Sequence, residues 1–157
     1  MEQGFVSGVS VDKNIARISI INVKDEPGIV YRIYNCLALN QIKIDMIIQS
    51  GSKGGVQDIS LTVGKPFLQD ALDIIQAHSR EIPAERVEYE TGVVKVTLVG
   101  HGIAGNPSVP ATLFEALFAA GVNIKAISTS EIRITVLLDV RDAEKALEAI
   151  QKVFHLK

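Results

Sequence analysis

Several residue types that signal particular functions are scarce in this chain. It contains no tryptophan, and aromatic residues make up only 5% of its 157 residues, which argues against stacking platforms for nucleic-acid bases. The formal net charge is −2, so the sequence also lacks the basic excess that accompanies nucleic-acid binding. We therefore expect no nucleic-acid partner.

Long apolar runs and cysteines are lacking as well. No apolar run approaches the roughly 18 residues of a membrane-spanning helix, and the N-terminus has no signal-peptide pattern. The single cysteine, Cys36, lies on an apolar stripe and is expected in the core, and one cysteine fits a reducing cytoplasm. No spacing of histidine, cysteine or acidic residues suits a metal ion. The sequence predicts a cytoplasmic protein without a membrane or metal partner.

What the chain does contain is an internal repeat. Residues 27–49 align without a gap to residues 107–129 at a constant offset of 80, with matching apolar positions around a shared proline. At 47% hydrophobic residues the chain has enough apolar side chains for a core. A duplicated module suggests paired binding surfaces rather than one active site.

The first copy predicts the element order β-α-β-β-α-β. Ile18 and Ile20 alternate with Arg17 and Ser19, which is strand period. The expected strands are 15–23, 42–48, 56–63 and 86–92, with a Gly-rich hairpin tip at 50–55. The first expected helix carries Ile29, Ile33, Cys36 and Leu37 inward, and the second, opened by Pro66, carries Phe67, Ala71, Leu72 and Ile75.

The second copy repeats this order but ends one strand short. Strands are expected at 93–100, 122–128 and 132–138, a helix closed by Gly121 lies between the first two, and Asp142 is expected to cap a last helix. An incomplete sheet would leave an open edge, so we expect the strand at 5–11 to complete it; the alternative is a loose tail. This predicts an α+β fold with two four-stranded antiparallel sheets, helices on one face, and an inserted domain, 15–92, within a discontinuous one, 1–14 plus 93–157.

The turn after the first strand of the inserted domain is the main candidate site. Helix N-termini offer unpaired N–H groups and a partial positive charge, which suit a carboxylate. Pro27 suits a helix start, Gly28 allows a ligand to approach bare backbone, and Asp25 could meet an ammonium group. Together these groups complement a free amino acid; the alternative is a simple solvated turn.

Several of these segments resemble a known family. KDEPGIVYRIYNCLALNQIKIDMIIQS, VQDISLTV and NIKAISTSEIRITVLL are similar to the tandem ACT domains at the C-terminus of bacterial aspartate kinases (aspartokinases). The resemblance covers nearly the whole chain and implies two ferredoxin-like βαββαβ domains with the inserted arrangement. In this family the regulatory portion is either fused to the kinase or a separate short subunit, and the segment after Met1 fits the latter or a fragment.

The resemblance implies feedback inhibition by an end-product amino acid, threonine or lysine or both, with no other cofactor. It implies a homodimer through the ACT domains and, as a further partner, the aspartate kinase catalytic domain or alpha subunit. By itself the chain is not expected to be an enzyme, because the catalytic domain is missing. The implied effector-binding residues are Asp25, Pro27, Gly28, Ile29, Val30 and Gln49, with Asn123 and Ile124 facing them.

A possible second effector site follows by the same carry-over. It would comprise Asn106, Pro107, Ser108 and Val109, facing Ile44, Asp45 and Met46. Here the sequence departs from the pattern, because Ser108 stands in the place of Gly28 and the turn is two residues longer. Whether this site binds an effector is therefore left open, as is a ligand contact by His101 in the same turn.

Three competing interpretations remain. The segment GHGIAG (100–105) spells a dinucleotide-binding fingerprint, but the helix starts after its third glycine and no acidic residue ends the next strand. The alternatives to effector binding are a ligand-free ACT-type dimerisation or interaction module and an ACT regulator of another amino-acid-pathway enzyme.

Overall fold

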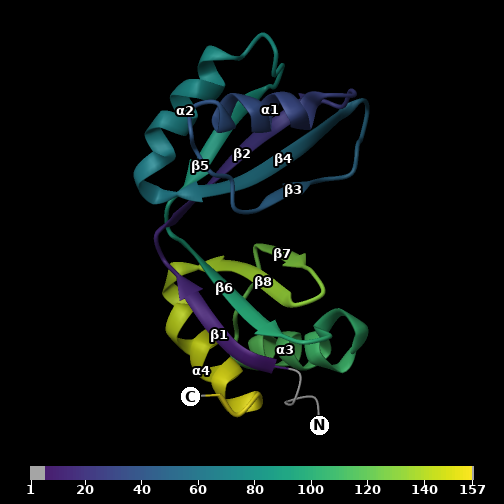
Figure 1. Cartoon of the computed structure of the whole chain (residues 1–157), viewed down its shortest axis with the longest axis vertical. Helices are drawn as coiled ribbons and strands as arrows, with labels where there is room; N and C mark the ends of the chain where they lie inside the picture. Colours follow the sequence, from purple (N-terminus) through teal and green to yellow (C-terminus); the bar gives the residue numbers. More distant parts are fainter. Residues whose placement is uncertain (1–5, 157) are drawn as a thin grey trace. The chain divides into compact units, whose positions relative to one another are not determined.

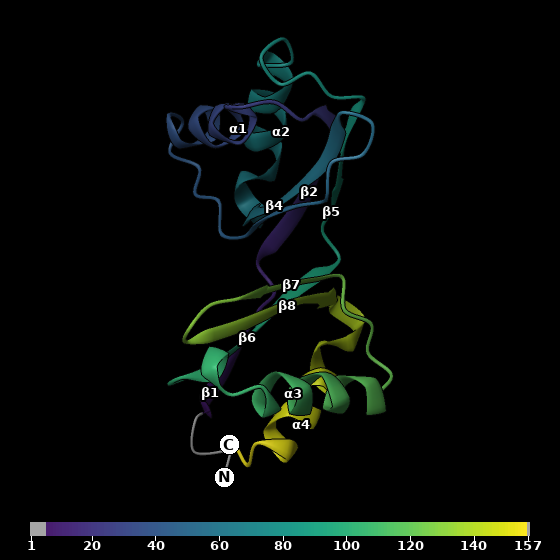
Figure 2. The ribbon, with the colours of Figure 1, turned by 90° about the vertical axis from the view of Figure 1, so that its right-hand side faces the viewer.

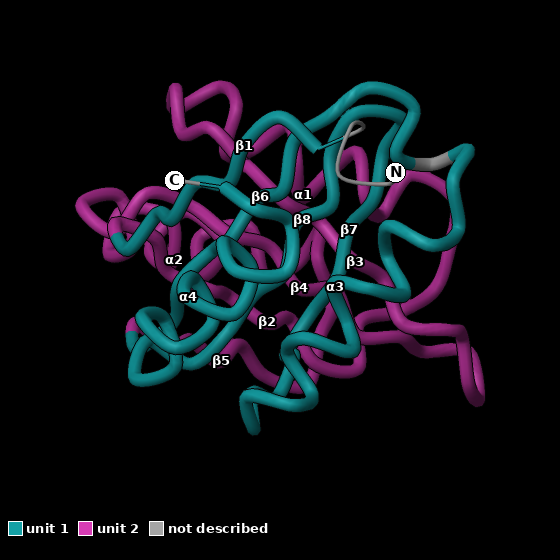
Figure 3. Tube along the Cα trace, turned by 90° about the horizontal axis from the view of Figure 1, so that it is seen from below, with its two compact units in different colours: residues 1–13, 92–157 teal, residues 14–91 magenta. Residues whose placement is uncertain are grey.

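The computed structural model describes residues 6–156. It divides the chain into two compact units (Figure 3): unit 1, residues 1–13 and 92–157, and unit 2, residues 14–91. The chain thus enters unit 1, leaves it to form unit 2, and returns. Within the described residues no helix is long and apolar enough to span a bilayer.

Unit 2 is a four-stranded antiparallel sheet with two helices on one face (Figure 1). The strand order is β3-β4-β2-β5. Its core is formed by the inward side chains of the strands and the apolar stripes of both helices, including Ile18, Ile20, Ile33 and Leu37. In chain order the elements are β2 (Ile15–Lys24), α1 (Ile29–Ala38), β3 (Ile47–Gln49), β4 (Val56–Gly64), the short 3-10 helix Lys65–Phe67, α2 (Leu68–Ala77) and β5 (Arg86–Glu90).

Unit 1 has the same architecture, with the strand order β1-β6-β8-β7 and its helices on one face, as Figure 2 also shows. The N-terminal strand β1 (Val6–Asp12) pairs antiparallel with β6 (Val93–Gly100) and forms an edge of this sheet. Phe5 of the expected strand lies outside the described residues. The remaining elements are α3 (Ser108–Ala119), β7 (Ala126–Thr129), β8 (Arg133–Asp139) and α4 (Ala143–Val153). The predicted fold class, α+β with two antiparallel sheets, is confirmed.

The strand expected at 42–48 is wrong in its extent, although its alternation is right. Ile42, Ile44 and Met46 are buried while Lys43 and Asp45 are exposed, yet the regular ladder begins only at Ile47. The residues just before Ile47 lie beside β4 but do not form regular ladder bonds throughout. The Met46 N–H, for example, donates to the side-chain hydroxyl of Thr62 at 3.0 Å. This bond also gives a partner to the hydroxyl of Thr62, which is buried although it alternates with the core-facing Leu61 and Val63.

Three other expectations are corrected. The strand expected at 122–128 starts at Ala126, because Val122 closes the preceding helix through its N–H bond to Leu117 O. Phe67, expected inward, is 48% exposed, because the chain first makes a 3-10 turn over Lys65–Phe67. Asp142 makes no capping hydrogen bond at the start of α4; instead Asp139 accepts from Arg141 N one turn earlier.

Asp139 also receives the Arg141 guanidinium. Arg141 Nη2 lies 2.9 Å from Asp139 Oδ2, and Arg141 Nε donates to Oδ1 at 3.0 Å. Hydrogen bonds from the Arg141 side chain and backbone N–H lower the pKa of Asp139 to about 2. The aspartate therefore stays ionised and holds the turn between β8 and α4 at neutral pH.

A β-bulge in β2 determines which side chains face the core just before the candidate turn. The β2–β4 register shifts between Ile20 and Val23, and Asn22 has a positive φ of 51°, a conformation that asparagine tolerates better than most residues. The bulge shifts the inward phase by one residue, so that Val23 is buried as Ile20 is. It therefore sets the orientation in which the chain enters the turn at Asp25.

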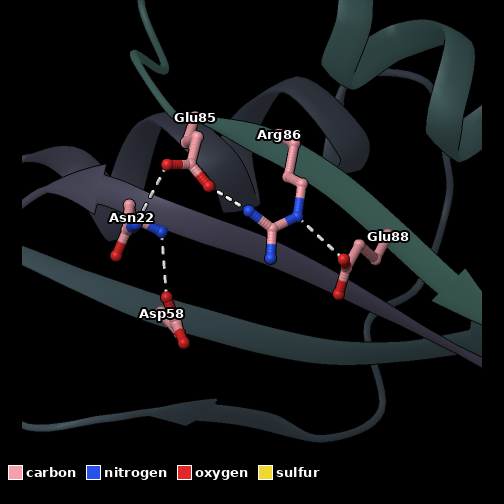
Figure 4. A network of polar contacts seen from close by, with 5 residues as sticks. All are labelled: Asn22, Asp58, Glu85, Arg86 and Glu88. Carbon is pink, nitrogen blue, oxygen red and sulfur yellow. Dashed lines mark hydrogen bonds and ion pairs between the residues drawn. The ribbon is translucent and has the colours of Figure 1, made fainter.

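A polar network on β2, β4 and β5 surrounds this bulge (Figure 4). The Asn22 N–H donates to Asp58 Oδ1 at 2.8 Å, and the Asn22 side chain donates to Glu85 Oε1 at 3.4 Å. Arg86 forms ion pairs with Glu85 and Glu88. The Asp58 bond supplies an acceptor for the backbone N–H that the bulge removes from the ladder.

The first helix of each unit ends in the same hydrogen-bonded turn. Ile42 N donates to Leu37 O, and Val122 N donates to Leu117 O, which is the Schellman pattern with a left-handed residue between. That residue is Gly121 in unit 1, with φ 73°, but Gln41 in unit 2, with φ 62°. Repeat-related positions thus adopt the same left-handed conformation, which is strained for Gln41 but not for Gly121.

We predict opposite effects of substitution at these two positions. A Cβ added at Gly121 meets no atom within 4 Å, so Gly121→Ala should lower the free energy of unfolding by about 1 kcal/mol through backbone strain alone. Gln41→Gly should raise it by up to about 1 kcal/mol, less the extra entropy of glycine in the unfolded chain. Urea denaturation of both variants measures this, and shifts of equal sign would contradict it.

We also predict that the bulge depends on the acceptor oxygen of Asp58. Asp58→Ala should lower the free energy of unfolding by roughly 0.5–1.5 kcal/mol, because it removes the partner of the Asn22 N–H. Asp58→Asn keeps an oxygen at this position and serves as the matched control, with a smaller loss. Urea midpoints of the two variants distinguish the hydrogen bond from the charge; equal losses would show that the charge matters instead.

Candidate functional site

The turn between β2 and α1 presents an uncapped helix N-terminus. Gly28, immediately before the helix, has φ 90°, and the helix start has no side-chain cap. Ile29 N donates to Glu26 O and Arg32 N donates to Gly28 O, but the N–H groups of Val30 and Tyr31 have no acceptor among the described residues. These groups are available to an anionic group.

Asp25 is connected to Gln49 through a third residue, Gln57. Gln57 Nε2 donates to Asp25 Oδ1 at 3.3 Å, and Gln49 Nε2 donates to Gln57 Oε1 at 3.0 Å. Gln57 is only 5% exposed, whereas Asp25 and Gln49 are exposed. Two candidate side chains from different elements are therefore joined by a buried amide, and we call these three residues the relay.

Gln57 was missed by sequence reasoning, although the strand pattern contains a signal for it. In β4, Ile59, Leu61 and Val63 form the inward phase, and Gln57 occupies the next inward position. A buried polar side chain requires a hydrogen-bond partner. A glutamine in the apolar phase of a strand, beside a candidate turn, therefore marks a second residue of the site.

The other first-site candidates contribute backbone more than side chain. The side chain of Ile29 is buried in the core of unit 2 and that of Val30 packs against it, so their groups facing the turn are those of the main chain. Pro27 is exposed. Asn123, which is exposed, and Ile124, which packs against the core of unit 1, lie in the segment before β7.

The second turn is already capped by its own side chain. Asn106 Oδ1 accepts from Ser108 N at 3.2 Å and from Ser108 Oγ at 2.6 Å. Asn106 O also accepts from Val109 N. The first N–H groups of α3 are thus occupied within the chain, and Pro107 before them is exposed.

The remaining second-site candidates are mostly core residues. The side chains of Val109, Ile44 and Met46 are buried, with 6% and 8% exposure for the last two. Asp45 is exposed, and its N–H donates to Thr62 O at 3.0 Å. On this segment Asp45 is therefore exposed, whereas its two apolar neighbours are buried.

The glycine-rich segment before α3 forms a short 3-10 turn, Ile103–Gly105, rather than the start of the helix. Ile103 inserts into the core of unit 1. Next to it is a hollow of about 480 Å³ lined by His101, Gly102, Gly105, Glu131 and Ile132. His101 thus borders a hollow, and the segment lacks the helix start that a dinucleotide fingerprint needs.

Strand pairing shows which residues of unit 1 correspond to the relay. Gln49 pairs with Ile59, and Thr129 pairs with Ile134, so Thr129 corresponds to Gln49. Counting back two residues along the partner strands places Ile132 where Gln57 stands. The repeat offset places Gly105 where Asp25 stands. Unit 1 thus has none of the three amide and carboxylate groups of the relay.

Cys36 lies in the core, as expected. Its Sγ donates to Ile33 O at 3.2 Å, and burial raises the pKa of the thiol. The cysteine is therefore a small apolar core residue rather than a reactive thiol.

Comparison with known proteins agrees with the fold. The family model for the ACT domain matches residues 96–154. An aspartokinase of Thermus thermophilus is 39% identical over 153 residues, which are 96% of this chain and 38% of the relative. An aspartokinase of Helicobacter pylori is 35% identical over 156 residues, 99% of this chain and 38% of the relative. This chain therefore spans about 38% of the length of these relatives.

Solved structures match over nearly the whole chain. The ligand-free regulatory subunit of aspartate kinase from Thermus thermophilus superposes with a TM-score of 0.90 at 38% identity, covering 95% of this chain and 98% of that one. Aspartate kinase from Synechocystis gives 0.91 at 33% identity, covering 97% of this chain and 27% of that one. A structure of aspartokinase alpha and beta subunits gives 0.88 at 38% identity, covering 96% of this chain and 99% of that one.

The structure has two units of related architecture, one inserted in the other, and it matches an entire regulatory subunit. The chain therefore belongs to the ACT-domain regulatory subunits and regulatory domains of aspartate kinase.

Proposed function

We propose that this chain binds an end-product amino acid, threonine or lysine, and thereby mediates feedback inhibition of aspartate kinase. The observation that supports this is the juxtaposition of an uncapped helix N-terminus and an exposed carboxylate in the turn between β2 and α1. The free N–H groups suit the effector carboxylate, and Asp25 suits its ammonium group.

In this proposal the site is completed by a second copy of the chain. The exposed Gln49 of one protomer faces the effector, and Asn123 and Ile124 of the other protomer close the site. Since the effector contacts two protomers, its binding favours the associated arrangement. Effector binding then shifts the equilibrium between two conformational states of aspartate kinase. The size of this shift is limited by the difference in effector affinity between the two states.

We propose that the second turn binds an effector more weakly than the first turn, or does not bind one. Asn106 already occupies the first N–H groups of α3, and a ligand carboxylate would have to displace it. One bound effector per chain is therefore the expected stoichiometry.

Thermal unfolding with each of the twenty amino acids tests the function. A ligand that binds only the folded state at a hundredfold excess over its Kd stabilises by about 2.7 kcal/mol, which raises Tm by several degrees for a chain of this size. We expect such a shift with threonine or lysine and with few others. No shift with any amino acid would leave the ligand-free interaction module as the function.

We predict that Asp25→Ala weakens effector binding strongly. A hydrogen bond to a charged group contributes about 1.5–3 kcal/mol, so Kd should rise roughly 10- to 100-fold. Isothermal titration calorimetry measures this. The matched control is Asp73→Ala, which removes an exposed aspartate of α2 in the same unit and should leave Kd unchanged. Equal affinity of Asp25→Ala and the parent protein would remove Asp25 from the site.

A further inference from the structure

The relay has a fixed hydrogen-bond direction. An ionised carboxylate only accepts hydrogen bonds, so the Gln57 atom that contacts Asp25 must be its NH₂ group. The other end of the Gln57 amide, Oε1, is then an acceptor, and the Gln49 atom that contacts it must be Nε2. Charge and chemistry thus determine the orientation of both amides, which matches the contacts in the structure.

This direction determines what the relay shows to a ligand. Gln49 Nε2 donates one of its two N–H groups to Gln57, so its carbonyl oxygen is left for a ligand beside the second N–H. The second Asp25 oxygen, Oδ2, likewise has no hydrogen bond within residues 6–156. Each exposed end of the relay therefore presents an acceptor oxygen. One suits the effector ammonium group, and the other needs a second donor from the ligand.

We infer that Gln57 is a positioning residue that makes this site specific for amino acids whose side chain carries a hydrogen-bond donor. This rests on the proposed function and adds the residue that sets its specificity. Gln57 does not reach the ligand, because it is buried beneath the two exposed side chains. Instead it orients Gln49 and Asp25, and a ligand without a side-chain donor leaves an acceptor without a partner.

The charged groups beside Gln57 lie in the turn between β2 and α1 and on β4. Asp25 is the charged side chain in contact with it. Lys24 and Glu26 flank Asp25 in the same turn, and Lys24 Nζ lies 3.5 Å from Glu26 Oε2. Asp58, the next residue on β4, is exposed and accepts from Asn22 N. A carboxyl group introduced at position 57 would therefore meet chiefly the carboxylate of Asp25.

The first test compares each effector with a side chain of similar shape that lacks the donor. Calorimetry should show that the parent protein binds threonine at least tenfold more tightly than valine, or lysine at least tenfold more tightly than norleucine. Gln57→Met keeps the length of the side chain without its polar atoms, and it should reduce this ratio several-fold. A Gln57→Met protein with the parent affinity and the parent ratio would overturn the inference.

The second test separates positioning from packing. In Gln57→Glu the protonated carboxyl group can reproduce the relay, because its O–H donates and its carbonyl oxygen accepts. Burial beside Asp25 raises the pKa of the introduced carboxyl. Relative to the parent protein, effector affinity should be near normal at pH 5 and at least tenfold lower at pH 8.5. The matched control is Gln69→Glu, since Gln69 also donates to a carboxylate, Asp73, but on the exposed face of α2. It should follow the parent protein at both pH values.

Unfolding without ligand distinguishes a failure of the inference from a failure of the proposed function. A carboxyl group with a raised pKa in the folded state loses stability as pH rises, so the urea midpoint of Gln57→Glu should fall from pH 5 to pH 8.5 relative to Gln69→Glu. If this fall occurs and no amino acid binds the parent protein, the relay exists but the function is wrong, and the specificity inference falls with it. If an effector binds and the Gln57→Glu protein follows the parent protein at both pH values, the inference alone is wrong.

Discussion

Antiparallel pairing between β1 and β6 is the interaction on which the architecture depends. It joins Asp12 to Lys95 and Val11 to Val96, across the entire length of unit 2 in the sequence. Without β1, the backbone groups of β6 would form an open sheet edge. Because β1 belongs to the sheet of unit 1, unit 2 is inserted between β1 and β6. The chain leaves unit 1 after β1 and returns to it at β6, and these two strands pair with each other.

Duplication gave two units with one backbone plan and different chemistry in their strand-to-helix turns. In unit 2 the helix N-terminus is open and the relay lies beside it. In unit 1 Asn106 caps the helix and the relay positions hold Gly105, Thr129 and Ile132. In the longer second turn, Ile103 enters the core of unit 1. The two turns therefore differ in what they leave unsatisfied, which is what a ligand can use.

Hydrogen bonds from side chains determine local structure at three places in unit 2. A buried amide has to satisfy both its ends, and in unit 2 the ends of the Gln57 amide are satisfied by two side chains that face outward. At the exposed bulge Asp58 accepts the Asn22 N–H, and beside β4 the buried Thr62 hydroxyl accepts from Met46 N. In the last two cases a side-chain oxygen accepts a backbone N–H in place of a carbonyl of the partner strand.

The sequence by itself determined the features that depend on near neighbours. Periodicity and backbone preference within a few residues predict the alternation of Ile18 and Ile20, the apolar stripe of α1, the helix end at Gly121 and the open turn at Gly28. The internal repeat indicated in addition that the chain contains two related units. Tertiary structure alone decided the partners of Gln57 and the late start of the ladder at Ile47. The physical reason is that burial, hydrogen-bond satisfaction and strand pairing depend on what lies opposite a residue in space, and those neighbours come from segments that local pattern does not connect.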